Sequence, residues 1–207
     1  MQTYEFGNPG ASVVLIEPIH TVEGMANEAE IIRELAGDDF LLRAVAVDWF
    51  RDLSPWTAPP AFGNTAFGDG AQKTLEKILK LTVEPGKQYV LGGYSMGGLY
   101  ALRAAYQTDA FAGVAAVSPS VWFPGFTEYT LSRPLHTGHV YLSLGDREEK
   151  TKNPVLAAVG DRIRELHERL AQQGVSCCLE WNKGNHFMDP DRRTAKGFAW
   201  ILKGINA

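Results

Sequence analysis

The chain has 207 residues, 45% of them hydrophobic and 21% charged, with a formal net charge of −4 and a pI near 5.7. This balance is that of an ordinary globular protein, and it gives no electrostatic reason to expect a nucleic acid or a membrane surface as partner. The start of the chain lacks a signal-peptide profile, no apolar run is long enough to span a membrane, and the two cysteines, Cys177 and Cys178, are adjacent, so we expect one cytoplasmic domain, residues 1–207, with reduced thiols.

Strand-like and helix-like segments alternate along the chain, which predicts an α/β fold with a mainly parallel central sheet and helices on both faces. We expect about six strands, at residues 12–16, 40–47, 89–91, 113–117, 140–144 and 175–181. Helical spacing lies between them, at residues 25–36, 75–79, 99–106, 153–174 and 195–202. The irregular stretch at residues 48–70 is long for a compact domain, and loops of that length are usually functional.

Residues 93–97 read Gly-Tyr-Ser-Met-Gly and lie between a short apolar strand and a helix. This is the G-x-S-x-G pattern of a nucleophile elbow, in which flanking glycines let the strand and helix pass closely and a strained serine is lifted clear of the sheet. Ser95 is then the candidate nucleophile, and the first backbone N–H of the helix, that of Met96, is a candidate oxyanion donor. The alternative reading is a glycine-rich turn whose serine caps the helix.

A serine hydroxyl needs a base to accept its proton, and the base needs an orienting acid. His186 follows the last expected strand, where the chain order serine, acid, histidine puts the base. The acid should follow the strand before it, in the turn at residues 145–149. Glu148 is the first choice by its position after the glycine, and the alternatives in the same turn are Glu149 and Asp146.

The second oxyanion donor is expected after the first strong strand. Because Pro18 has no N–H, the candidates there are Ile19 and His20. Four aromatic residues are candidates for the wall of a substrate pocket: Trp56, Phe62, Phe67 and Trp122. No dinucleotide fingerprint, Walker motif or zinc-ligand spacing occurs, so we expect neither a cofactor nor a metal.

Four segments together resemble one branch of the α/β-hydrolases: residues 94–98, the Ser-Pro-Ser-Val-Trp-Phe run at 118–123, residues 145–149, and the Gly-Asn-His run at 184–186. That branch includes siderophore (enterochelin) esterases, S-formylglutathione hydrolases and feruloyl esterases. The resemblance implies an α/β-hydrolase fold with Ser95 as nucleophile, His186 as base and a carboxylate near Glu148. Compared with the branch the chain is short, which implies a reduced N-terminal part.

The leading hypothesis is a serine carboxylester hydrolase that forms an acyl-enzyme with a small or medium soluble ester. The same three residues could instead serve an acyltransferase or a thioesterase. From a different class comes a hydrolase-fold protein that binds a ligand without turnover. The natural ester and the oligomeric state are left open by these patterns.

Overall fold

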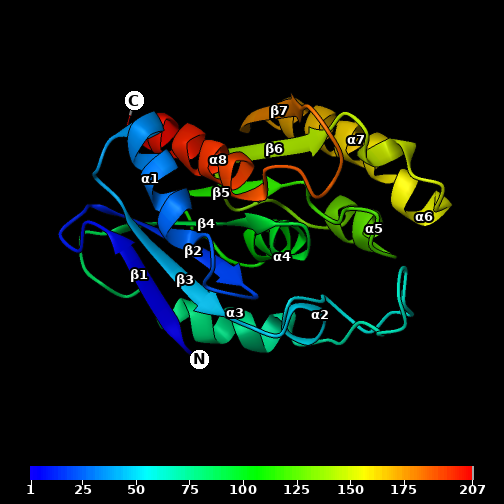
Figure 1. The fold of residues 1–207 in the computed structure, drawn as a ribbon, viewed down its shortest axis with the longest axis horizontal. Coiled ribbons are helices and arrows are strands. Elements are labelled where there is room, and N and C mark those ends of the chain that lie inside the picture. Colours follow the sequence, from blue (N-terminus) through cyan, green and yellow to red (C-terminus); the bar gives the residue numbers. More distant parts are fainter. Residues whose placement is uncertain (207) are drawn as a thin grey trace.

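A computed structural model describes residues 1–206, which form a seven-stranded sheet in the order β1-β3-β2-β4-β5-β6-β7 (Figure 1). The strands are β1 Thr3–Gly7, β2 Val13–Ile19, β3 Leu41–Ala46, β4 Gln88–Tyr94, β5 Gly113–Val117, β6 His139–Gly145 and β7 Ser176–Asn182. All neighbouring strands run parallel except β1, which pairs antiparallel with β3. The six expected strands are therefore confirmed, and β1 is an additional edge strand.

Helices cover both faces of the sheet, as predicted (Figure 1). One face carries α1 Met25–Ala36 and α8 Pro190–Ile205, and the other carries α3 Ala71–Leu79, α4 Met96–Ala105, α5 Phe126–Leu131 and α7 Val159–Gln172. Side chains alternate between the two cores along each strand, so that Val14 and Ile16 of β2 face α3 and α4 while Val13 and Leu15 face α1 and α8. Among residues 1–206, no helix combines the length and the apolar character needed to cross a membrane.

Two segments differ from the expectation. The helix expected over residues 153–174 is divided at Ala158 into α6 Pro154–Ala157 and α7. The irregular stretch at residues 48–70 contains a short helix, α2 Trp49–Asp52, whose first turn is capped because the Asp48 side chain accepts a hydrogen bond from the N–H of Arg51.

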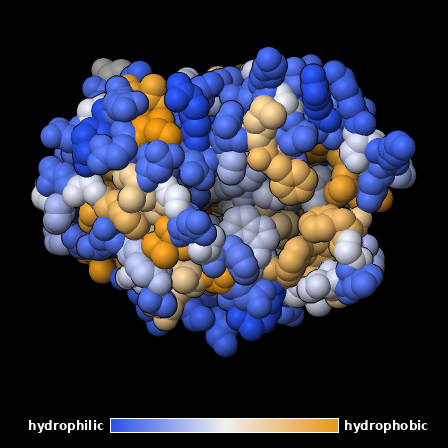
Figure 2. All heavy atoms as spheres, in the orientation of Figure 1, coloured by the Kyte–Doolittle hydropathy of each residue, from blue (hydrophilic) through white to orange (hydrophobic). Residues whose placement is uncertain are grey.

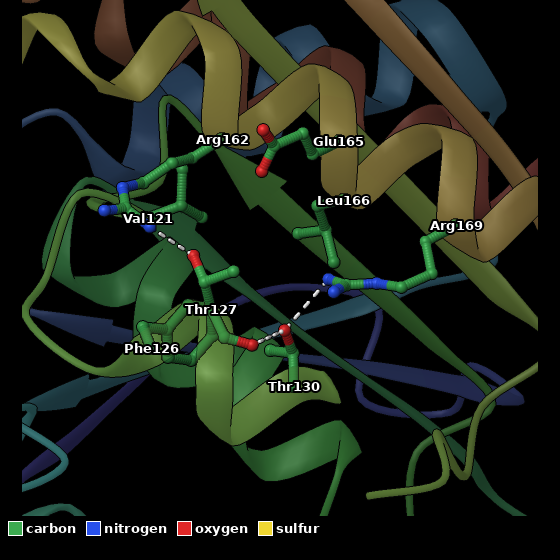
Figure 3. Close-up of a pocket in the computed structure, with 8 residues that line it drawn as sticks. All are labelled: Val121, Phe126, Thr127, Thr130, Arg162, Glu165, Leu166 and Arg169. Atoms are coloured by element: carbon green, nitrogen blue, oxygen red, sulfur yellow. Dashed lines mark hydrogen bonds between the residues drawn. The ribbon is translucent and has the colours of Figure 1, made fainter. Parts of the chain in front are cut away.

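Helix α7 is tied to α5 by two arginines. Arg162 donates to the hydroxyl of Thr127, and Arg169 donates to the hydroxyl of Thr130 at 2.9 Å (Figure 3). The gap between these side chains encloses only about 10 Å³, which is room for about one water molecule. This contact is therefore a link between helices rather than a ligand site.

Two buried carboxyl groups lie together between β2 and α1. Glu17 is 5% exposed and Glu28 is 3% exposed. Burial raises the pKa of Glu17 to about 7 and, with the charge of Glu17, raises the pKa of Glu28 well above its ordinary value. Because the folded state binds these protons more tightly than the unfolded chain, the contribution of this pair to stability is fully present below pH 4.5 and is lost as the pH rises through 7.

Glu28→Gln removes one of these two titrating groups and keeps the shape of the side chain. We expect its free energy of unfolding to exceed that of the wild type by about 1–3 kcal/mol at pH 8, with little difference at pH 5. Urea unfolding at both pH values measures this, with Glu34→Gln on the exposed side of α1 as the matched control. A gain of equal size at the two pH values would show that the effect is not ionisation.

Candidate active site

The turn between β4 and α4 is held in an unfavourable backbone conformation. Ser95 has φ 53° and ψ −115°, a region that costs a residue with a side chain about 1–3 kcal/mol. A Cβ on Gly93 would lie 3.0 Å from the backbone of Gly97, and a Cβ on Gly98 would lie 3.0 Å from the carbonyl oxygen of Gly93. Glycine is thus needed at 93 and 98, whereas a Cβ on Gly97 would meet its neighbours only at 3.6 Å.

The Ser95 hydroxyl makes no capping hydrogen bond to α4, so the helix-cap reading of this serine is wrong. Its Oγ lies 3.0 Å from Nε2 of His186 and 3.3 Å from the hydroxyl of Ser120. The other imidazole nitrogen of His186, Nδ1, lies 2.7 Å from Oε2 of Glu148. Residues 95, 186 and 148, which follow three different strands, therefore form one continuous hydrogen-bonded relay.

Glu148 is the buried end of this relay. Its Oε1 accepts hydrogen bonds from the N–H of Gly145 at 2.7 Å and the hydroxyl of Ser118 at 2.8 Å, and it pairs with Arg193 at 3.1 Å. Burial alone would raise the pKa of Glu148, but the hydrogen bond and charge of His186, with those from Gly145 and Ser118, lower it below its ordinary value. The carboxylate is accordingly held in the charged form that can orient an imidazole.

Arg193 also helps to position His186, through the hydroxyl of Tyr94. It lies on α8, is 2% exposed, and donates to the hydroxyl of Tyr94 at 2.7 Å. That hydroxyl in turn donates to the backbone oxygen of His186 at 2.9 Å. One buried guanidinium thus contacts the Glu148 carboxylate directly and, through the Tyr94 hydroxyl, the backbone of His186. Neither Arg193 nor Tyr94 was predicted from the sequence as a site residue.

The two alternative acids have other partners. The Glu149 carboxylate pairs with Arg164 of α7 at 2.8 Å. Asp146 accepts a hydrogen bond from the N–H of Gly184 at 2.8 Å and so holds the loop that leads to His186. Of the three carboxylates in this turn, Glu148 is the one that contacts the imidazole.

The candidate oxyanion donors lie near the elbow in different settings. Met96 is the first residue of α4, where a backbone N–H has no acceptor within the helix. Ile19 is the last residue of β2 and His20 is exposed beyond it. Neither Ile19 nor His20 lines the cavity described next, although the carbonyl oxygen of Pro18 passes close to Gly97.

A cavity of about 700 Å³ opens beside Ser95 and His186. On the face of the molecule drawn in Figure 2, a hollow is bordered by hydrophobic side chains. Two of the four predicted aromatic residues, Phe62 and Trp122, line the cavity. Other lining residues were not predicted from the sequence: Trp49, Phe50, Leu156, Val159, Phe187 and Pro190 among them.

The other two predicted wall residues lie outside the cavity lining. Phe67 is 3% exposed and packs behind Trp122, with ring centroids 6.0 Å apart. Trp56 packs against Phe123, and its indole N–H donates to the carbonyl oxygen of Pro124 at 2.9 Å. Both therefore support the wall from the core. Within residues 1–206, no three His, Cys, Asp or Glu side chains are grouped so that they could hold a metal ion.

Residues 19–200 match the family model described as the alpha/beta hydrolase family. The chain belongs to this family. A curated relative is the "Uncharacterized protein YbbA" of Bacillus subtilis, which is 25% identical over 116 residues. That alignment spans 53% of this chain but 46% of YbbA, so the chain covers less than half of the relative's length.

Solved structures share the fold of this family member over nearly its whole length. The siderophore hydrolase EstA of Aspergillus nidulans matches with a TM-score of 0.67 and 20% identity, over 97% of this chain and 86% of EstA. An IroE-like serine hydrolase of Shewanella oneidensis matches with a TM-score of 0.75 and 16% identity, over 97% of this chain and 75% of that one. The predicted α/β-hydrolase fold is confirmed, and siderophore-hydrolase structures are among those that share it.

Proposed function

We propose that the protein is a serine carboxylester hydrolase in which Ser95 is the nucleophile, His186 the general base and Glu148 the orienting acid. The observation that carries the proposal is the relay itself, with 3.0 Å between Ser95 Oγ and His186 Nε2 and 2.7 Å between His186 Nδ1 and Glu148 Oε2. These distances are those at which a base can accept the proton of a hydroxyl while an acid holds its tautomer. The adjacent cavity has room for a small or medium ester.

In this mechanism Ser95 Oγ attacks the ester carbonyl carbon while its proton passes to Nε2 of His186. The imidazolium is stabilised by the Glu148 carboxylate and gives the proton to the leaving alcohol as the carbon–oxygen bond breaks. Water then attacks the acyl carbon while His186 accepts its proton, and His186 returns that proton to Ser95 Oγ as the bond between Oγ and the acyl carbon breaks and the carboxylic acid leaves. The negative charge of each tetrahedral intermediate would be met by the N–H of Met96, and loss of such a donor typically costs about 3–4 kcal/mol.

The comparisons support an ester as substrate. The named functions of structural neighbours include siderophore hydrolase and carboxylesterase, the latter from Bacillus cereus at 16% identity and a TM-score of 0.62. The strained backbone of Ser95 supports a reactive role, because such strain at a non-glycine residue concentrates at functional sites.

A fluorophosphonate probe tests the nucleophile directly. We expect rapid labelling of the native protein, with the modified peptide containing Ser95, and a burst of 4-nitrophenol when 4-nitrophenyl acetate is mixed with enzyme at comparable concentration. Absence of both labelling and burst would favour the hydrolase-fold protein that binds without turnover. Added alcohol or thiol acceptors then identify an acyltransferase, because it would divert most of the acyl group from water to the acceptor. A thioesterase would still use water, and it is recognised by faster hydrolysis of a thioester than of the oxygen ester of the same acid.

A further inference from the structure

Two cations line the cavity beside Ser95 without a carboxylate partner. Arg147 and Lys150 lie on either side of Glu148 in the turn after β6, and both border the cavity. Across the part of the chain that the structure describes, no carboxylate is within ion-pair distance of either, whereas Arg43, Arg164 and Arg193 each have at least one. Both side chains are exposed to solvent and border the space that a ligand would occupy.

The acidic residue of the same lining does not balance them. Both oxygens of the Glu148 carboxylate are already engaged, by His186 on one side and by Arg193, Ser118 and Gly145 on the other. The Glu148 side chain is also only 5% exposed, and its negative charge is compensated by the buried guanidinium of Arg193. The formal charges of Arg147 and Lys150 are therefore uncompensated along the cavity lining, although the chain has a net charge of −4.

The backbone that carries the two cations is held in place. The N–H of Arg147 donates to the carbonyl oxygen of Gly184 at 3.1 Å, which joins this turn to the loop of His186. The N–H of Lys150 donates to the carbonyl oxygen of Arg147 at 3.1 Å within the short helix η1 Glu148–Lys150. Both side chains thus start from fixed positions next to the relay.

The rest of the cavity wall is largely apolar and aromatic, and it includes Phe50, Phe62, Trp122, Leu156 and Val159. An apolar wall of this kind binds the hydrocarbon part of a ligand and, because it lowers the local dielectric, strengthens the attraction of nearby cations for an anion. The two properties occur together in one cavity of about 700 Å³.

We propose that the substrate of this site is an ester that carries an anionic group, such as a carboxylate, on an apolar or aromatic body, with the anion bound by Arg147 and Lys150. The inference rests on the proposed esterase function and specifies its substrate class. The anion could belong to the acyl part or to the alcohol part of the ester, and the two are separated by experiment.

Two matched substrate pairs provide the test. The first pair, 4-acetoxybenzoate and 4-acetoxybenzamide, differs only in a charge on the alcohol part. The second pair, mono-4-nitrophenyl adipate and its terminal amide, differs only in a charge on the acyl part. For at least one pair we expect kcat/KM to be about five- to tenfold higher for the anionic ester, with the preference decreasing in 0.5 M salt.

Arg147→Gln/Lys150→Gln should bring the preferred ratio close to one. The matched control is Lys152→Gln/Lys183→Gln, which removes the same net charge from exposed side chains that do not line the cavity and should keep the ratio. A wild-type ratio of one or less for both pairs would overturn the inference. So would a ratio that survives the first double variant, or one that falls equally in the control.

Failure of the esterase proposal is recognised separately, because it appears as absence of Ser95-dependent hydrolysis of the neutral esters. The anion site is then judged by binding alone. Isothermal titration calorimetry of the Ser95→Ala protein should show about five- to tenfold tighter binding of 4-acetoxybenzoate than of 4-acetoxybenzamide, a difference lost when Arg147→Gln/Lys150→Gln is added. Equal binding of the two compounds would reject the site itself.

Discussion

Ser95→Ala is expected to lower kcat for 4-nitrophenyl acetate by about 10⁴-fold or more, and His186→Ala by a similar factor. Alanine at 95 removes the attacking oxygen, and alanine at 186 leaves the hydroxyl with no base at the 3.0 Å position that Nε2 now occupies. Because the two groups act as a unit, the double variant should be no slower than the slower single variant. Steady-state rates at saturating ester, corrected for spontaneous hydrolysis, measure all three.

His167→Ala on α7 is the control for loss of an imidazole, since this residue is half-buried away from the cavity and should keep wild-type kcat. Circular dichroism checks that every variant is folded. Wild-type turnover by a folded Ser95→Ala protein would reject the proposed nucleophile. If kcat of the double variant fell below that of the wild type by the product of the two single-variant factors, serine and histidine would act independently and not through the relay.

The parts of this fold that were predictable are those with a local signature. The Gly-Tyr-Ser-Met-Gly turn at residues 93–97 is recognisable from its own residues, although the structure needs glycine at 93 and 98 and not at 97. Buried strands such as β5 are continuous apolar runs that are recognisable without knowledge of their neighbours. Chain order alone pointed to His186 and to the turn that contains Glu148. The structure brings these segments within hydrogen-bonding distance, because the carboxyl ends of parallel strands β4 and β6 and the loop after β7 meet at one edge of the sheet.

What was missed depends on contacts between distant segments. Strand β1 alternates between exposed and half-buried residues at the sheet edge, so it shows no apolar run, and its partner β3 is about forty residues away. Trp56 and Phe67 were assigned to the pocket as members of a long loop, but that loop folds back so that both contact the core beside Phe123. The sequence of a long loop does not show whether an aromatic side chain in it faces the cavity or packs behind the cavity wall in the core.

Arg193 illustrates the same limit in a charged residue. On the sequence it is one of two adjacent arginines near the start of the last helix, where a solvated side chain is the usual outcome. Only the packing of α8 over β4, β5 and β6 turns residue 193 inward to Glu148 and Tyr94. Because Arg193 is buried against Glu148, the Glu148 carboxylate has two expected roles, orienting His186 and pairing with a buried cation. Substitutions at the two positions can separate these roles.

Glu148→Gln is expected to lower kcat by about 10²–10⁴-fold, because an amide can no longer stabilise the imidazolium of His186. Glu149→Gln, which changes the neighbouring carboxylate in the same way but contacts Arg164, should stay within about twofold of wild type. Initial rates for the two variants, compared at one temperature well below unfolding, identify the acid. A larger loss in Glu149→Gln than in Glu148→Gln would reverse the assignment.

Glu148→Gln also leaves Arg193 as a buried cation without its carboxylate, so the free energy of unfolding should fall by about 3–5 kcal/mol. Adding Arg193→Met removes the unpaired charge and should restore part of that stability, since a buried ion pair is often replaceable by apolar groups. It should not restore kcat, because the imidazole still lacks its anion. Urea unfolding and steady-state kinetics on the same three proteins measure both effects. If activity returned together with stability, Glu148 would act by holding the fold and not by orienting His186.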